Sequence, residues 1–284
     1  MAILRGFSRC VNGLQVLEES LGLTGSYDGV LVAIDCEHTG NLRNGFRDSQ
    51  DSQVGLAILD PHDLLVGETE TPKIATHNFV TGSVPYTTKS SERFLFGKAV
   101  TVSTGDLLRQ IEAVLPQDRD IILIGHSVGC EVAILRTLGF KFQAVCAIVE
   151  TTKLANEVFE FWRGSLGSLL RICKCPFSDL HNGGNDAHFT LRAALHLVDK
   201  GCQQIECESL AALEAIRGVL SIPIPIRPDV KIMLAKKKEK AARGQRRLNS
   251  RKKKSRTAEE QDQIRAERAA RRKEAESRPQ WCFV

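Results

Sequence analysis

Apolar and polar positions alternate along this chain in two distinct periods. Short runs rich in β-branched residues predict buried strands at 29–36, 54–59, 74–80, 121–124 and 145–149. Apolar residues at helical spacing predict helices over 10–22, 104–115, 129–138, 185–200 and 209–220, and residues 153–174 are predicted to be mainly helical. The polar stretches 40–52 and 82–93 are predicted to be loops. Three strands in a row, followed by strands alternating with helices, predict an α/β fold with helices on the faces of a mixed β-sheet.

Charge is divided unevenly between the body of the chain and its C-terminal part. Residues 231–280 contain 19 Lys/Arg and 7 Asp/Glu, a net charge of +12, whereas the remainder contains 20 and 27, a net charge of −7. We predict a folded domain over 1–228, with its core at about 10–200, and a basic, largely disordered tail over 229–284. A tail of this charge favours nucleic acid as a partner, and the alternative is a segment that is only solvated.

Cysteine usage and hydropathy bear on where the protein works. The nine Cys residues form no CxxC pair, which favours a reducing compartment inside the cell. No apolar stretch reaches transmembrane length, so we expect no membrane partner. Residues 1–17 vaguely resemble a mitochondrial leader, although their apolar spacing fits an ordinary helix better. Because the basic blocks of the tail also fit a nuclear address, we expect the nucleus and/or the cytoplasm.

Acidic residues gather where the predicted strands end. Asp35 and Glu37 stand two positions apart at the end of the first strand, so both point to one face of the sheet. Two like charges in that position are unfavourable unless a cation neutralises them. Glu131 follows the strand 121–124, five residues after His126, and it lies in the helix predicted to begin there.

A third polar stretch opens the helix predicted near residue 185. Asp186 lies in its first turn, and His181 lies five residues earlier on the preceding loop, where its imidazole could accept a proton from water. The Gly183-Gly184 pair between them permits a close backbone approach. Four carboxylates and one His in this order predict a site that holds two divalent cations and activates a water molecule.

The middle stretch has a second interpretation. Residues 125–129, Gly-His-Ser-Val-Gly between a strand and a helix, match the G-x-S-x-G nucleophile elbow of α/β-hydrolases, with Ser127 as the nucleophile. Asp179 would then supply the acid and His181 or His196 the base. That interpretation gives no role to the four carboxylates and finds no oxyanion loop. We therefore favour the two-cation site, typical of a metal-dependent nuclease, which explains all three stretches.

Taken in order, these stretches resemble the DEDDh exonucleases, a ribonuclease H-like family. Its pattern is D-x-E-x-T-G, then G-H-N with an Asp five residues after the His, then H-x-A-x-x-D-A. Residues 35–40 match the first motif, and residues 181–187 match the last, with Gly in the Ala position. The middle motif departs twice, because Ser127 replaces Asn and Glu131 replaces Asp. The phrase LHNGGNDAHFTLRAAL is similar to a fungal branch of the family, some members of which are linked to mRNA export or small-RNA pathways.

The resemblance covers about residues 10–200 and implies a ribonuclease H-like fold and a two-metal 3′–5′ exonuclease of RNA or single-stranded DNA. It implies that two Mg²⁺ or Mn²⁺ ions are held by four carboxylates and that His181 is the general base. The implied metal ligands are Asp35, Glu37, Glu131 and Asp186, and the implied substrate contacts are His38, Thr39 and His126. Because Glu131 lengthens one ligand arm, the alternative is a catalytically weak ribonuclease H-like module that binds nucleic acid or a ribonucleoprotein partner.

Overall fold

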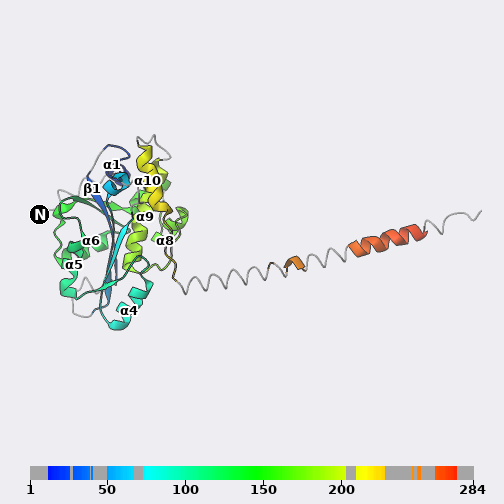
Figure 1. Cartoon of the computed structure of the whole chain (residues 1–284), viewed down its shortest axis with the longest axis horizontal. Helices are drawn as coiled ribbons and strands as arrows, with labels where there is room; N and C mark the ends of the chain where they lie inside the picture. The colour runs from blue at the N-terminus through cyan, green and yellow to red at the C-terminus, as the bar shows by residue number, and fades with distance from the viewer. Residues whose placement is uncertain are drawn as a thin grey trace, which may run out of the picture. The chain divides into compact units, whose positions relative to one another are not determined.

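The structure is a computed structural model that describes residues 12–25, 28–38, 40, 50–66, 73–160, 162–202, 209–227, 245, 248–250 and 260–273. The chain divides into two compact units, Met1–Pro225 and Ile226–Val284. In the first unit, a central sheet lies between two layers of helices, as Figure 1 shows.

The described elements of the first unit follow one another in a β-rich first half and a helix-rich second half. In chain order they are α1 (Gly13–Ser20), β1 (Gly29–Glu37), β2 (Ser52–Leu59), α3 (Pro61–Val66), β3 (Ala75–Thr81), α4 (Val84–Arg93), β4 (Val100–Thr101), the 3-10 turn η3 (Thr104–Asp106), α5 (Leu107–Val114), β5 (Asp120–Gly125), α6 (Gly129–Leu138), the 3-10 turn η4 (Phe142–Ala144), β6 (Val145–Glu150), α7 (Thr151–Phe159), α8 (Leu166–Ile172), α9 (Gly183–Cys202) and α10 (Leu210–Ser221).

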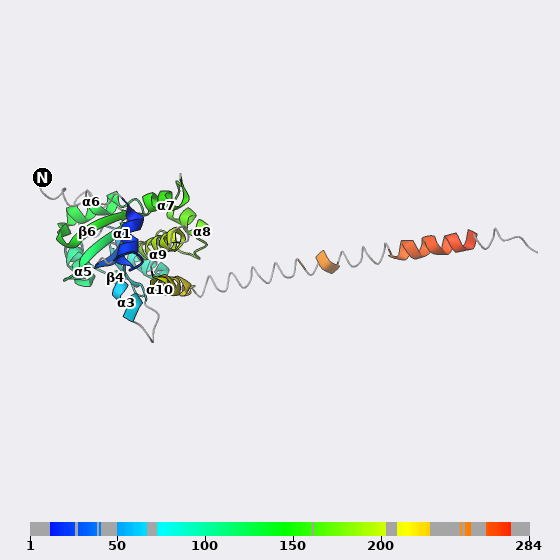
Figure 2. The same cartoon turned by 90° about the horizontal axis from the view of Figure 1, so that it is seen from above.

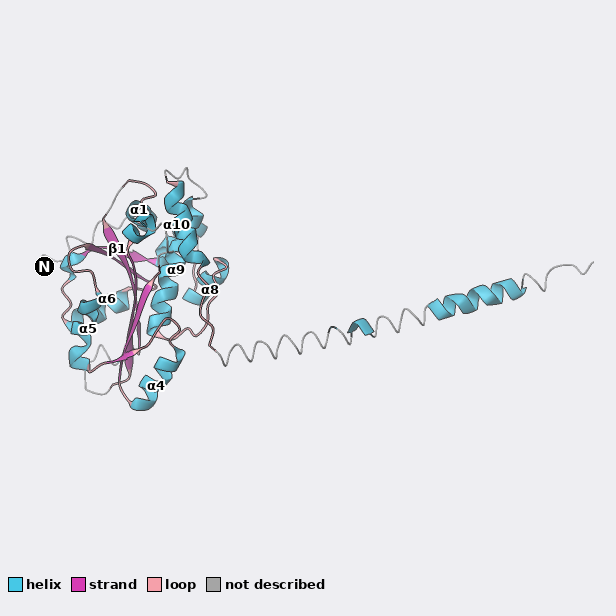
Figure 3. Ribbon diagram, in the orientation of Figure 1, coloured by secondary structure: helices cyan, strands magenta, loops and turns pink. Residues whose placement is uncertain are grey.

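The sheet is mixed, with its strands in the order β4-β3-β2-β1-β5-β6. Strand β2 runs antiparallel to both β1 and β3, whereas β5 runs parallel to β1 and β6 parallel to β5. Figure 3 shows these strands edge-on between the helices. The predicted ribonuclease H-like α/β fold is therefore confirmed. Strands β1 and β5 end at the same edge of the sheet, where open α/β folds place their ligands.

Each face of the sheet has its own apolar core. Alternate residues of β1, such as Leu31 and Ala33, pack beneath α9 together with α1, α7, α8 and α10. Their neighbours Val30 and Val32 point to the other face, which α5 and α6 cover. Figure 2, turned by 90°, keeps α9 and α10 on one side of the sheet and α5 and α6 on the other. Because both faces are buried, β1 is apolar along its whole length until it reaches Asp35.

One predicted loop is a helix. Residues 82–93 contain no apolar stripe, yet α4 occupies Val84–Arg93, with a Pro in its first turn. Its buried face is polar and consists of Thr87 and Ser90, which hydropathy cannot distinguish from a solvated loop. A second correction is smaller: the helix predicted over 104–115 begins with the 3-10 turn η3, which the side chain of Ser103 caps, and becomes an α-helix at Leu107. Most of the loop predicted at 40–52 lies outside the described residues.

The predicted basic tail falls mainly in the second unit, and most of it lies outside the described residues. Residues 260–273 form an exposed helix. Across the described part of both units, no helix combines the length and apolarity that crossing a membrane requires. The domain boundary at residue 228 stays a prediction, although the first compact unit ends nearby at Pro225.

Candidate metal centre

The carboxyl end of β1 directs two acidic side chains to the face that α9 covers. Asp35 and Glu37 continue the alternation of Leu31 and Ala33, whose side chains lie in the core beneath α9. Asp35 is half-buried, with its Oδ2 atom buried, and the Glu37 side chain keeps 23% of its surface exposed. This end of β1 therefore forms the floor of the candidate site.

The loop before α9 brings the third motif onto this floor. Its backbone is left-handed at Asp179 and His181, with φ of 52° and 64°. Asn182 caps the helix through its side-chain oxygen, which accepts a hydrogen bond from the Asn185 N–H at 3.3 Å. The Asp186 carboxylate accepts the His181 N–H at 2.7 Å. The loop and the first turn of the helix are thus fixed to each other.

Three ligand-type side chains converge at this point. One ligand atom from each of Glu37, His181 and Asp186 lies within 4.8 Å of the others. The His181 imidazole Nδ1 lies 3.8 Å from a Glu37 oxygen, and its side chain is 87% exposed. The imidazole is therefore open to a water molecule and a substrate, while the Asp186 carboxyl beside it is only 6% exposed.

Burial and neighbouring negative charges raise the pKa values of two acidic residues in the site. Burial is the main cause that raises the pKa of the Asp35 carboxyl well above its usual range, and the charges of Asp186, Glu37 and Glu131 add to it. Burial, together with Glu37, raises the pKa of Asp186 to about 7, although the hydrogen bond from the His181 N–H opposes the shift. The charges of three neighbouring carboxylates thus oppose the ionisation of Asp35.

Glu131 reaches the cluster from the other side of β1. It lies in the first turn of α6, directly after β5, and its side chain is buried. Its negative charge contributes to the raised pKa of Asp35 and of the buried thiol of Cys36, so it lies near both residues. It does not belong to the group of three whose ligand atoms lie within 4.8 Å of one another.

The donor set fits divalent cations. The Asp35 Oδ2 and Asp186 Oδ1 atoms are buried and accept no hydrogen bond from any residue that the structure describes. Unsatisfied buried carboxylate oxygens are unfavourable unless a cation binds them. Mg²⁺ and Mn²⁺ prefer carboxylate oxygen ligands, which this site supplies from three separate segments of the chain.

The three predicted substrate contacts have different placements. His38 follows Glu37 directly, is exposed and packs edge-to-face against Tyr86 of α4, with ring centroids 5.1 Å apart. Thr39 lies outside the described residues. The His126 imidazole is hydrogen-bonded to the Thr151 hydroxyl at 2.9 Å and faces Trp162. The structure therefore brings His38 to the rim of the cluster and turns His126 toward α7.

The geometry around Ser127 opposes the hydrolase interpretation. Both the Ser127 and the Val128 backbone N–H groups donate to the Glu150 carboxylate, each at 2.8 Å. In a nucleophile elbow, the N–H after the serine must remain free to stabilise an oxyanion. Ser127 does have the left-handed backbone of an elbow, with φ of 69°, but here that turn leads into α6, which carries Glu131.

A polar network that the sequence patterns did not predict supports the His181 loop. The Gln53 side-chain oxygen accepts hydrogen bonds from Ser90 at 2.8 Å, Asn182 at 3.0 Å and the Gly183 N–H at 3.2 Å. Its amide donates to the Tyr86 hydroxyl at 3.0 Å. Gln53 thus joins α4 at the rim of the site to the cap of α9. The predicted strand begins at Val54, one residue after Gln53, so no sequence pattern marked this side chain.

We predict that Gln53→Leu destabilises the protein and misplaces the His181 loop. The Gly183 N–H then loses its side-chain acceptor in a buried position, which costs about 1–3 kcal/mol. Urea unfolding should show this loss of stability. The catalytic rate constant should also fall under conditions where the variant is still fully folded. Gln15→Leu, at an exposed position of α1, is the matched control and should change neither quantity. Normal activity of Gln53→Leu would refute a positioning role.

Comparison with known proteins identifies the class. A sequence model of the family described as "DNA polymerase III subunit epsilon-like, C-terminal domain", a DEDDh family, matches residues 30–197. The matched region spans β1 to α9 and contains every residue of the candidate centre. The chain therefore belongs to the DEDDh exonuclease family.

Two curated relatives come from the yeast Saccharomyces cerevisiae. One is "Good for full DBP5 activity protein 2", which is 23% identical over 229 residues, covering 68% of this chain and 40% of the relative. The other is the uncharacterized protein YDR514C, 23% identical over 183 residues, covering 52% of this chain and 38% of the relative. The chain thus spans about two fifths of the length of each of these relatives, and the predicted similarity to fungal proteins is confirmed.

Proposed function

We propose that the protein is a metal-dependent 3′–5′ exonuclease that acts on RNA or single-stranded DNA. The observation that carries the proposal is the convergence of Glu37, His181 and Asp186 within 4.8 Å, near Asp35 and its buried Oδ2 atom. Membership of the DEDDh family supports it. Like charges gathered in this way favour a bound cation over any purely structural role.

In this proposal, two Mg²⁺ or Mn²⁺ ions are held by Asp35, Glu37, Glu131 and Asp186. When bound, they supply Lewis-acid stabilisation of charge on a phosphodiester. His181 accepts the proton of the attacking water, because its imidazole is exposed beside Glu37. The Asp186 carboxylate fixes the loop that carries His181, since it accepts the His181 N–H at 2.7 Å.

The direct test uses single strands labelled at the 5′ end, as RNA and as DNA, with Mn²⁺, Mg²⁺ or EDTA. We expect a ladder of products shortened one nucleotide at a time, which EDTA abolishes. A circular single strand has no 3′ end and should stay intact. Binding without a ladder would instead support the catalytically weak module, an alternative that the longer Glu131 arm favours. The name of the first yeast relative, which refers to the activity of another protein, also makes a ribonucleoprotein partner worth testing.

The middle motif gives a discriminating pair of variants. We predict that Glu131→Asp retains or raises nuclease activity, because it restores the shorter ligand of the family motif. Ser127→Ala should leave activity largely unchanged, since the Ser127 side chain has no assigned role. Initial rates on the labelled strand measure both. Loss of activity in Ser127→Ala would favour the α/β-hydrolase interpretation instead. Loss of activity in Glu131→Asp would mean that the local backbone of α6 is adapted to the longer Glu side chain.

The basic tail is proposed to supply most of the sequence-independent affinity, because the rest of the chain carries a net charge of −7. Each phosphate that a Lys or Arg neutralises adds about −0.7 to the slope of log affinity against log salt for single strands. A chain ending at Pro228 should therefore bind more weakly and with a flatter slope. Titrations of both lengths across a salt series measure this, and identical slopes would refute it. The same basic blocks support our proposal of a nuclear and/or cytoplasmic location.

A further inference from the structure

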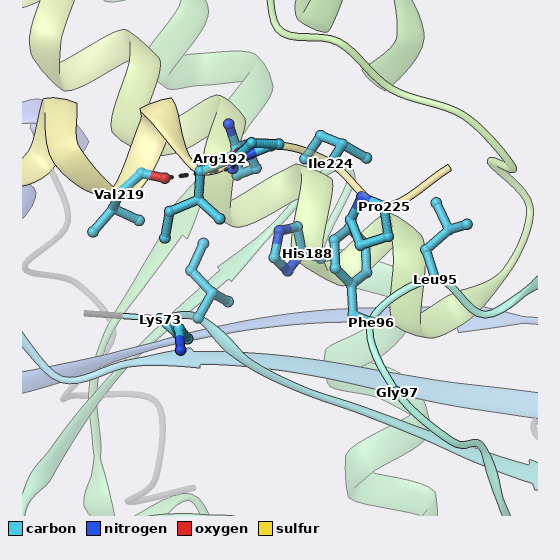
Figure 4. Close-up of a pocket in the computed structure, with 12 residues that line it drawn as sticks. Lys73, Leu95, Phe96, Gly97, His188, Arg192, Val219, Ile224 and Pro225 are labelled. Atoms are coloured by element: carbon cyan, nitrogen blue, oxygen red, sulfur yellow. Dashed lines mark hydrogen bonds between the residues drawn. The ribbon is translucent and has the colours of Figure 1, made fainter. Parts of the chain in front are cut away.

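A pocket of about 380 Å³ lies in the first unit, beneath the end of α10, where no function has been assigned. Its walls come from α9, from the start of β3, from residues 95–97 and from residues 219–225 (Figure 4). Most of the lining side chains are aliphatic or proline. The volume is that of a small-molecule site.

One wall contains a buried cation. Arg192 is 2% exposed, and its guanidinium donates to the backbone carbonyls of Val219, Leu220 and Ile222 at the end of α10. These acceptors are neutral, and the ion pairs of the described residues include none between Arg192 and an acidic residue. A buried charge without a counter-ion is costly, and Arg stays protonated in proteins.

The other charged side chain of the pocket is also positive. Lys73 lines the pocket as a second cation and is exposed, whereas the described lining residues include no Asp or Glu. Between them, the His188 imidazole stacks on the Phe96 ring, with centroids 3.5 Å apart and planes 13° from parallel. Figure 4 shows this stacked pair beside the wall that contains Ile224. The pocket therefore offers flat, apolar walls and only positive charge.

We propose that this pocket binds a small anion that has a flat, apolar ring, such as an aromatic carboxylate. The ligand's ring would lie among the apolar walls near Phe96, and its carboxylate would balance Lys73 and the charge of Arg192. A nucleic-acid strand fits poorly, because a cavity of about 380 Å³ lined mainly by apolar groups would satisfy few of its polar atoms. An organic cation is opposed by both Lys73 and Arg192. The proposal does not depend on nuclease activity.

The test compares three indole compounds of nearly equal size. These are indole-3-acetate, the neutral indole-3-acetamide and the cationic tryptamine, titrated into the full chain by calorimetry and ligand-observed NMR. We expect one site for the acetate with a Kd of about 1 mM or tighter, which is typical of a ligand with this number of atoms. The amide should bind about tenfold more weakly, which corresponds to about 1.4 kcal/mol, and tryptamine should not bind.

Two variants locate the site. Lys73→Glu should weaken the binding of the acetate at least several-fold, whereas Lys141→Glu, an exposed charge reversal elsewhere, should not. Ile74→Trp enlarges a half-buried lining residue and should abolish binding of both the acetate and the amide. The proposal would be overturned by equal affinity for the three compounds, by no saturable binding of the acetate up to about 5 mM, or by unchanged binding in Lys73→Glu or in Ile74→Trp.

Discussion

Replacing Asp186 with Asn is expected to abolish metal-dependent cleavage and to raise the unfolding temperature of the metal-free protein. The variant removes one proposed metal ligand, so activity should fall by at least about 10²-fold. It also removes a buried charge that opposes the ionisation of Asp35, whereas an Asn oxygen can still accept the His181 N–H. A residue that is unfavourable for stability but required for activity is typical of a functional site.

The gain in stability should depend on pH in a defined direction. The pKa of Asp186 is raised from its ordinary value of 3.8 to about 7 in the folded protein. Between these values the folded state binds more protons than the unfolded state, so this group makes stability fall as pH rises. The variant should therefore differ little from the parent near pH 4 and be more stable at pH 8, by roughly 2–4 °C for each kcal/mol gained.

Thermal unfolding at several pH values, with EDTA and with Mn²⁺, measures both effects. Mn²⁺ should raise the unfolding temperature of the parent, most clearly at pH 8, and should raise that of Asp186→Asn far less. Asp199→Asn is a matched control near the other end of α9, where it removes an ion pair with Arg217. That control should keep full activity and its metal response. A lower unfolding temperature of metal-free Asp186→Asn at pH 8 would contradict our account of the site.

Gly55→Ala is expected to be the most damaging single-methyl change in the centre. A Cβ built on Gly55 would fall on the backbone carbonyl group of Gly183, far inside van der Waals contact. Gly55 pairs with Asp35 in the sheet, so α9 could relieve the clash only by moving away from the floor of the site. Overpacking of this kind typically costs 1–3 kcal/mol, and backbone cannot move aside as a side chain tip can.

Urea unfolding and the nuclease assay measure the two consequences of Gly55→Ala. We expect a lower midpoint and a loss of activity that persists at temperatures where the variant is still folded. Gly105→Ala is the control, because a Cβ there meets nothing within 4 Å, and its effect should stay within about 0.5 kcal/mol. A fully active and stable Gly55→Ala would show that α9 does not press on β2 as the structure describes.

Local sequence patterns predicted an element correctly where its buried side chains are apolar. The central strands are short β-branched runs buried on both faces, so β1 and β5 were predicted nearly to the residue. The same logic failed for α4, whose buried face consists of Thr87 and Ser90 and is satisfied by hydrogen bonds. Polar burial leaves no hydropathy signal. For the same reason the role of Gln53 could be recognised only with its partners in place.

The sequence by itself determined the central strands, the apolar-striped helices, their order and the identity of the acidic residues, because these depend on side-chain periodicity and on motifs of a few residues. Only the tertiary structure decided which of those residues meet. Glu37 and Asp186 are far apart along the chain and become neighbours because α9 lies across β1 and β2, where glycine permits backbone-to-backbone contact. The raised pKa of Asp186 and the cationic pocket beneath α10 arise in the same way, since burial and proximity are properties of the packed chain.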